Sequence, residues 1–430
     1  MDKASRNHNH KSRNFFNSLR VGAFLATRDI KRANKWTTIL IIFIMTLTFL
    51  NLVVVSGILV GLIEGATAAV GNRYLGDVFI SNLREKTYIE NSQDIINLAK
   101  SLPGVENVTA RYIEGGTIES DYKTNKRRPD DIDKSVPTSI AGIDPIAEDR
   151  VTHISESLIE GEFLDEDDYD QVVIGALLIQ KYLGFESPSF TTLKTAEVGD
   201  KVQVVIGGNT REVRIKGILK SKVDEIDRRV FFVDKQLRGL IGRYDYNVDE
   251  IVLRLKPNVN ATAIKNALVK SGFDQYARVQ TRDDAEPKFL KDIKQTFALL
   301  GSVISSIGLI AAAITIFIII FVNAITRRRF IGIMKGIGVT SIAVEFSYVL
   351  QSVFYAAFGT IIGVFLVFVV LVPYFNNNPI DFPFSDGILV ATLSGTFIRA
   401  IILFISTVIA GYIPARIVVK QNTLDAILGR

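Results

Sequence analysis

The sequence predicts an α-helical membrane protein with four transmembrane helices and a large extracytoplasmic α/β domain between the first and the second helix. Hydrophobic residues make up 48% of the 430 residues, and they concentrate in four blocks. Each block exceeds the roughly 20 apolar residues that cross a hydrocarbon core of about 30 Å. A long mixed segment, 64–296, separates the first block from the second, and Lys and Arg gather beside the blocks.

Residues 1–35 precede the first block and carry nine Lys/Arg against two acids. Phe16 and Phe24 alternate with Arg20 and Arg28, which predicts an amphipathic helix in the cytoplasmic interface. A partly disordered tail is the alternative, and we expect disorder over 1–12 in either case. The first block, 36–63, is too long for the apolar part of a signal peptide, so we expect an uncleaved anchor.

The segment 64–296 has mixed α/β patterning. Apolar spacing predicts helices at 92–101 and 261–271, and strands at 78–81, 105–109, 230–233 and 251–255. Alternation of period two on both sides of Gly207-Gly208 predicts a β-hairpin. We expect a membrane-proximal α/β part with a strand-rich insertion at about 136–249.

The remaining blocks predict three further spans, at 297–325, 346–372 and 388–413. A basic loop, a short connection and a tail join or follow them, at 326–345, 373–387 and 414–430. The basic loop carries four cations and no acid over 327–340, whereas the charged residues of the short connection are two acids, Asp381 and Asp386. The enrichment of Lys and Arg in cytoplasmic loops therefore predicts a multi-pass protein of the cell (inner) membrane with both termini in the cytoplasm.

The basic loop holds the candidate functional residues. It combines cations, apolar side chains and glycines: Arg327, Arg328, Arg329, Ile331, Gly332, Ile333, Met334, Lys335, Gly336, Ile337 and Gly338. We expect a helix of one to two turns, broken by the glycines, whose isoleucines and methionine form one apolar face. An ordinary basic cytoplasmic loop is the alternative, because topology alone explains the arginines.

Two polar residues lie inside the predicted spans. Asn51 is near the middle of the first span, where we expect it to hydrogen-bond across helices. Arg399 lies about 22 Å from Pro414 at 1.5 Å per residue. It either faces a protein interface or a wet cavity, or extends its head group to the outer lipid surface.

The sequence offers little for catalysis. There is no cysteine, and no segment fits the phosphate-binding pattern G-x-x-x-x-G-K-[ST]. The acidic run 165–170 lacks the glycine and glutamate of an EF-hand loop, so a solvated loop is favoured over a calcium site. We expect no catalytic, cofactor or metal site. Nucleic acid is not an expected partner, because the cations adjoin the spans.

The layout and several motifs resemble the MacB/FtsX/LolC-type permease subunits of ABC transporters, also called mechanotransmission permeases. The run 327–340 is similar to the family pattern R-R-R-E-I-G-I-L-K-A-I-G-A-T. Shorter matches are L-P-G-V-E at 102–106, V-I-G followed by V-G-D-x-V at 173–202, and P-A-R at 414–416 followed by 422–428. Phe330, Gln351 and Thr423 depart from the family's Glu, Glu and Pro, which puts any salt bridge at the first two positions in doubt.

The resemblance implies that the basic loop is a coupling helix for a separate cytoplasmic ABC ATPase dimer, which binds the ATP. It also implies a second permease copy, identical or not, and contact with lipid. The leading hypothesis is export or extraction of a lipoprotein, peptide, lipid or drug outside the membrane, with a periplasmic adaptor as a possible partner. An FtsX-like signalling subunit that activates an extracytoplasmic enzyme is the alternative. A static scaffold would leave the basic loop unexplained.

Overall fold

The computed structural model describes residues 2–120, 122, 135–183, 191–382, 385–387 and 389–421. The chain divides into two compact units. We call the first the membrane unit (1–62, 293–380 and 387–430) and the second the α/β unit (63–292 and 381–386). The motif at 422–428 lies outside the described residues.

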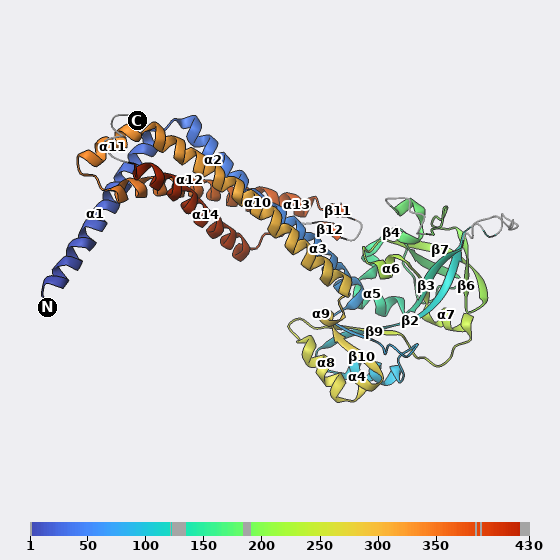
Figure 1. Cartoon of the computed structure of the whole chain (residues 1–430). Coiled ribbons are helices and arrows are strands. Elements are labelled where there is room, and N and C mark those ends of the chain that lie inside the picture. The colour runs from blue at the N-terminus through green and yellow to red at the C-terminus, as the bar shows by residue number, and fades with distance from the viewer. Residues whose placement is uncertain are drawn as a thin grey trace. The chain divides into compact units, whose positions relative to one another are not determined.

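The membrane unit is built from helices (Figure 1). Four continuous helical stretches, Lys35–Leu75, Lys288–Thr326, Ser341–Asn377 and Leu393–Val419, are long and apolar enough to cross a membrane, and each contains most of one predicted span. The elements are α1 (Asp2–Arg32), α2 (Lys35–Leu50), η1 (Asn51–Val55), α3 (Ser56–Val70), α10 (Lys288–Thr326), α11 (Arg328–Gly336), α12 (Ser341–Phe365), η7 (Leu366–Leu371), α13 (Val372–Asn377) and α14 (Leu393–Val419). Helices α3 and α10 extend across the boundary into the α/β unit, to which η2 (Gly71–Leu75) belongs. Strands β11 (Ile380–Phe382) and β12 (Ser385–Gly387) lie in the connection before α14.

The helices differ from the predicted bounds in three places. Helix α1 begins at Asp2, before the stretch in which the sequence predicts an amphipathic helix. The second spanning helix begins at Lys288, before the predicted start of the span at 297. Pro414 lies inside α14, which continues to Val419 rather than ending at the proline.

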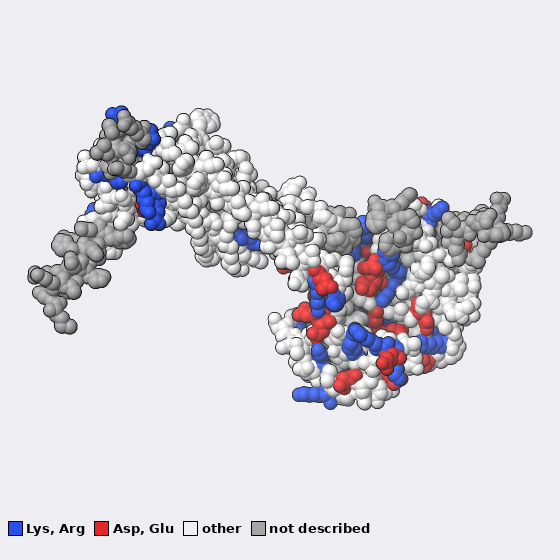
Figure 2. Space-filling model, viewed as in Figure 1, with Lys and Arg blue, Asp and Glu red and all other residues white. Residues whose placement is uncertain are grey.

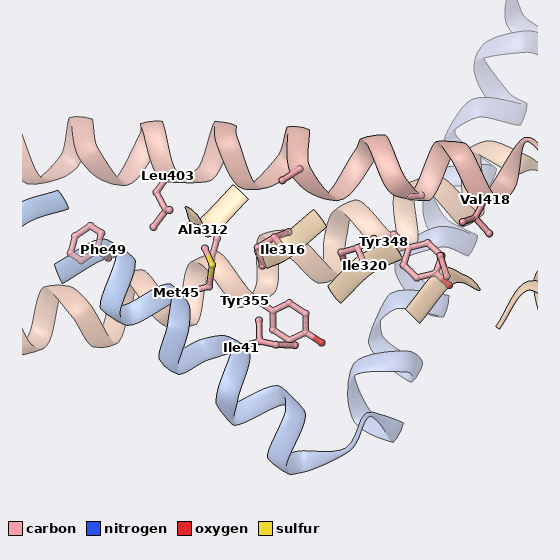
Figure 3. Packing of buried hydrophobic residues seen from close by; sticks show 14 of the residues in the cluster. Ile41, Met45, Phe49, Ala312, Ile316, Ile320, Tyr348, Tyr355, Leu403 and Val418 are labelled. Atoms are coloured by element: carbon pink, nitrogen blue, oxygen red, sulfur yellow. The ribbon is translucent and has the colours of Figure 1, made fainter. Parts of the chain in front are cut away.

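Helix α12 is the centre of the membrane unit, because α1, α2 and α14 all pack against it. Small residues allow these contacts. A Cβ on Gly359 of α12 would lie 2.5 Å from the Cβ of Met45 in α2, and one on Gly411 of α14 would lie 2.5 Å from Ser352 Oγ. Close approach at small residues is the usual packing of helices in a membrane. Figure 3 shows the apolar core that results, with Ile316 of α10 among its members.

The α/β unit contains ten strands in one sheet. Its elements are β1 (Val78–Asn82), α4 (Ser92–Ser101), β2 (Val105–Glu119), β3 (Val136–Ile143), α5 (Pro145–Thr152), η3 (Ile154–Ser157), β4 (Leu158–Gly161), β5 (Gln171–Gly175), η4 (Ala176–Leu178), η5 (Gln180–Tyr182), β6 (Lys201–Ile206), β7 (Asn209–Leu219), α6 (Asp224–Asp227), β8 (Arg229–Val233), α7 (Asp234–Ile241), β9 (Glu250–Leu255), α8 (Ala261–Lys270), η6 (Phe273–Gln275), β10 (Ala277–Thr281) and α9 (Arg282–Ala285).

The long strand β2 belongs to two parts of this sheet. Its first half pairs with β9, which continues through β1 to β10. Its second half pairs with β3 on one side and β6 on the other, and the order β2-β3-β8-β5-β7-β6 returns to β2 as a closed ring. Closure removes free strand edges. The strand-rich segment is therefore a small barrel, and its interior is filled by apolar side chains such as Ile140, Val204 and Phe232.

The predicted hairpin is the clearest local match in this unit. Strands β6 and β7 pair in antiparallel register, with Ile206 opposite Asn209. Gly207 and Gly208 both have positive φ, at 56° and 85°. This conformation suits the right-handed twist of a two-residue hairpin, and glycine adopts it without steric cost. Helices α4 and α8 cover the open part of the sheet (Figure 1).

A buried cluster of charged side chains joins the two parts of the α/β unit. Arg111 of β2 pairs with Glu148 of α5 at 2.6 Å and with Glu250 of β9 at 2.9 Å. Arg229 of β8 pairs with Glu250 at 3.0 Å, and the Tyr74 hydroxyl donates to the same carboxylate at 2.5 Å. Burial alone would raise the pKa of Glu250, but Arg229 and Arg111 outweigh it and lower that pKa to about 2.

The acidic run 165–170 also pairs with nearby cations. Lys216 Nζ contacts the carboxylates of Asp165 and Asp168 at 2.6 and 2.7 Å. Arg211 contacts Asp170 at 2.7 Å. These acids therefore tie a loop to strand β7.

Candidate functional site: the α11 segment

The basic loop folds as a defined short helix, α11. Arg327 leaves the helical conformation (φ −103°, ψ 11°) and separates α10 from α11. The helix then runs without a break through Gly332 to Gly336, so the expectation that glycines interrupt it is wrong. Gly338 has a φ of 98°, a left-handed conformation that commonly ends helices and favours glycine. Thr340 caps the start of α12 by accepting a hydrogen bond from the amide of Ala343.

The apolar side chains of α11 divide between two faces. Ile331 is only 3% exposed, and Met334 packs against the apolar core of the membrane unit. In contrast, Phe330, Ile333 and Ile337 are 58%, 46% and 78% exposed. These three lie at positions i, i+3 and i+7 of the segment, which share one side of a helix. We call them the outer face of α11.

This division corrects the predicted apolar face. The sequence-based prediction placed Ile331, Met334, Ile333 and Ile337 on one apolar face. Without knowledge of the neighbouring helices, it could not tell which of these side chains face the protein core. Packing against the membrane core uses Ile331 and Met334, so they cannot meet a partner at the same time. Phe330, which departs from the family pattern, takes a place on the outer face instead.

The cations of the segment have different surroundings. Arg327 Nη1 forms an ion pair with Asp29 Oδ1 of α1 at 2.6 Å. Lys335 Nζ donates to the backbone oxygens of Val419 and Gln421, at 3.0 and 3.3 Å, where α14 ends. Arg329 is exposed. Figure 2 shows Lys and Arg gathered at this end of the membrane unit, beside an almost uncharged helical surface.

Sequence reasoning missed Asp29 and the end of α14 as neighbours of α11. A signal for Asp29 was present, since it is one of two acids in the basic segment 1–35. No pattern in the sequence points to the backbone oxygens at 419 and 421. An added Cβ on Gly336 or Gly338 would meet no atom within 4 Å among the described residues, apart from the adjoining backbone.

The intramembrane polar residues lie apart from α11. Arg399 is in the second turn of α14, and its guanidinium donates to Ser56 Oγ of α3 at 2.6 Å. It therefore faces another helix of the chain. Asn51 begins the π-helical segment η1 and packs against Gly308 of α10. Its Oδ1 is buried and has no hydrogen-bond partner among the described residues. Glycine offers no side-chain donor there.

Comparisons with known proteins agree with this architecture. The sequence matches the MacB-like periplasmic core domain over 38–271 and the FtsX-like permease C-terminal domain over 302–423. A macrolide export ATP-binding/permease protein MacB of Campylobacter jejuni is 26% identical over 231 residues, 51% of this chain and 34% of that protein. An uncharacterized ABC transporter permease of Methanocaldococcus jannaschii is 24% identical over 282 residues, 63% of this chain and 65% of that protein.

The crystal structure of the periplasmic region of MacB from Actinobacillus actinomycetemcomitans aligns with a TM-score of 0.35 and 18% identity. The alignment covers 51% of this chain and 92% of that one. This chain spans only about a third of the length of the first MacB proteins that it matches.

Four membrane-spanning helices and a large α/β domain with these two matches define a membrane permease. The chain belongs to the MacB/FtsX-type permease family of ABC transporters.

Proposed function

We propose that the chain is the non-catalytic membrane subunit of an ABC transporter. A separate ATPase dimer binds and hydrolyses ATP, and its movement reaches the α/β unit through the membrane helices. The substrate, a lipoprotein, peptide, lipid or drug, is exported or extracted outside the membrane. The family supports the ATPase partner, and the MacB relatives are named as macrolide exporters.

The observation that carries this proposal is the outer face of α11. Three large apolar side chains are exposed on a short helix at the cationic end of the membrane unit. An amphipathic helix that lays an apolar face into a groove of a partner is a recurrent mode of recognition. Arg329 lies beside these side chains and suits an acidic rim on the partner. The anionic headgroups of lipids are the alternative partner for Arg329.

The positive-inside rule supports a cytoplasmic position for α11 and both termini, and an extracytoplasmic position for the α/β unit. Because the chain lacks cysteine, a single cysteine at residue 209 of the β6–β7 hairpin tests this orientation. We expect an impermeant thiol reagent to label it on intact cells. Labelling only after lysis would overturn the orientation.

A second permease copy and a periplasmic adaptor complete the proposed assembly. One side of α10 supports a second copy or lipid as its neighbour, since Leu299, Val303 and Ile307 are largely exposed. The alternative function is an FtsX-like signalling subunit, in which the same ATPase strokes activate an extracytoplasmic enzyme. The match to the FtsX-like permease C-terminal domain supports this alternative.

The test is capture of the partner ATPase by the full chain. Ile333→Asp with Ile337→Asp places two charges in the proposed interface, and we expect affinity to fall more than about tenfold, as at interface hot spots. Ile146→Asp in the α/β unit is the matched control, because Ile146 is 45% exposed and Ile333 is 46% exposed. The control should retain the ATPase. Full retention by the double variant would show that the outer face of α11 is not the docking site.

A further inference from the structure

Helix α11 is attached to the rest of the membrane unit at both of its ends. At the start, Arg327 is paired with Asp29 at 2.6 Å, and the two side chains are 42% and 30% exposed. Gln351 of α12 donates to the other oxygen of Asp29 at 3.4 Å. The side chains of Leu25, Phe330 and Met334 lie around the same small cavity as the ion pair. The first contact therefore joins α1, α11 and α12.

Helix α1 gives Asp29 a fixed position on α12. Ser18, Gly22 and Ala26 are buried at intervals of four residues, so they form one side of α1. A Cβ on Gly22 would lie 2.5 Å from the backbone oxygen of Ala343, which shows how closely the two helices approach. Thr340, the N-cap of α12, donates to Ser18 Oγ at 2.9 Å. Asp29 thus projects from a helix that is already packed against α12.

The second contact is at the other end of α11. Lys335 donates to the backbone oxygens of Val419 and Gln421. The last carbonyls of a helix have no partner inside the helix and carry the negative end of its dipole, so a Lys ammonium is a favourable partner for them. This contact ties α11 to the end of α14.

We infer that Asp29 and Lys335 are positioning residues, which hold α11 between α1 and the end of α14 so that its outer face points toward the partner. The inference rests on the proposed docking function of that face. It assigns to Arg327 and Lys335 a role within the chain, in place of the contact with an ATPase or lipid that the sequence suggested. A displacement of α11 is then transmitted to α1 through the ion pair of Arg327 with Asp29, and to the end of α14 through Lys335.

The test measures the position of α11 directly, without the ATPase. The cysteine-free full chain is placed in lipid nanodiscs and spin-labelled in two pairs, Phe24→Cys with Ile337→Cys and Ile417→Cys with Ile337→Cys. All three sites are at least half exposed. We expect Asp29→Asn to broaden the first distance distribution and Lys335→Met to broaden the second. Unchanged distributions in both variants would overturn the inference.

Rescue variants separate positioning from a general loss of folding. Asp29→Arg combined with Arg327→Asp reverses the ion pair and should restore the narrow first distribution, and Lys335→Arg should preserve the second. Gln351→Leu, which removes the weak 3.4 Å bond to Asp29 and a 3.5 Å bond to Ser347 but keeps the ion pair, should leave the first distribution almost unchanged. Failure of the reversed pair to restore a distribution that Asp29→Asn broadened would overturn the role of Asp29.

ATPase affinity provides the second readout. Without spin labels, Asp29→Asn should weaken capture of the ATPase about two- to fivefold, in line with a partly exposed ion pair. The reversed pair should recover it. If the Ile333/Ile337 double variant keeps the ATPase while Asp29→Asn and Lys335→Met still broaden the distances, the docking function fails and the positioning role stands. If the double variant loses the ATPase while the distances stay narrow, the positioning role fails alone.

Discussion

The two units of this protein place their charged side chains in different ways. In the α/β unit, Arg111, Glu148, Arg229 and Glu250 are buried and form ion pairs between three strands and helix α5, which are far apart in the chain. In the membrane unit, Arg327 and Lys335 lie at helix ends, where they contact one carboxylate and two backbone oxygens respectively. Figure 2 shows the contrast as mixed charge on the α/β unit and nearly uncharged membrane helices.

This difference bears on what each unit can do. A buried ionic cluster tolerates little movement, because separating its members leaves uncompensated charges in a dry interior. Contacts at exposed helix ends are worth less and break more readily. The α/β unit is therefore expected to hold its internal shape, while α11 can shift at modest cost. Three substitutions test this comparison.

The largest effect is expected from Arg111→Met, which removes the cation shared by Glu148 and Glu250. Two buried carboxylates then lose a partner, and the α/β unit should lose about 3–5 kcal/mol of stability. Hydrogen exchange of the β2 and β9 amides in the full chain measures this loss. Arg228→Met is the matched control, because its ion pair with Asp224 is partly exposed, at 35% and 67%, and is worth at most about 1 kcal/mol. Equal effects of the two variants would refute the comparison.

An intermediate effect is expected from Gly359→Ala in α12. The added Cβ would lie 2.5 Å from the Cβ of Met45, so α2 and α12 must move apart at a cost of about 1–3 kcal/mol. Gly336→Ala in α11 is the control, because an added Cβ there meets no neighbouring atom among the described residues and improves helix propensity by at most about 1 kcal/mol at this last residue of the helix. Thermal unfolding in detergent should show opposite shifts. If Gly336→Ala lowered the melting temperature, the premise that an added Cβ at Gly336 meets no neighbouring atom would be wrong.

The smallest effect concerns Asp249, beside the ionic cluster. Burial raises its pKa from 3.8 to about 6, although its carboxylate accepts a hydrogen bond from the amide of Ile113. The folded state therefore binds this proton more tightly than the unfolded state, and its contribution to stability falls as pH rises from about 4 to about 6. Asp249→Asn should raise stability at pH 7.5 by about 1–2 kcal/mol, reduced for partial exposure, and by little at pH 4.5.

Hydrogen exchange of β9 amides at the two pH values checks this. A gain of the same size at both would show that the amide acts by packing rather than by removing a charge. Glu250 provides the opposite trend within the same strand. Its pKa is lowered to about 2, so its stabilisation is present above about 4.5 and is lost as pH falls toward 2 in wild type and variant alike.

Local patterns were enough to predict much of this protein. The four spans follow from length and apolar content, because a bilayer sets a minimum length that few soluble segments reach. The β6–β7 hairpin follows from alternation around Gly207-Gly208, since both signals depend on neighbours in the chain. The position of α11 was found in the same way, from cations and glycines between two spans. These features depend on short-range chemistry, which the order of residues fixes directly.

Only the tertiary structure shows how these elements pack together and which of their side chains become buried. Closure of the barrel through β2 joins residues that are far apart in sequence. The inner side of α11 is set by the core on which Ile331 and Met334 pack, and that core comes from the four long apolar helical stretches. Asp29 meets Arg327 across almost 300 positions of the chain. A helical period shows which side chains share a face, but only the neighbours in space determine which face is covered and which remains open to a partner.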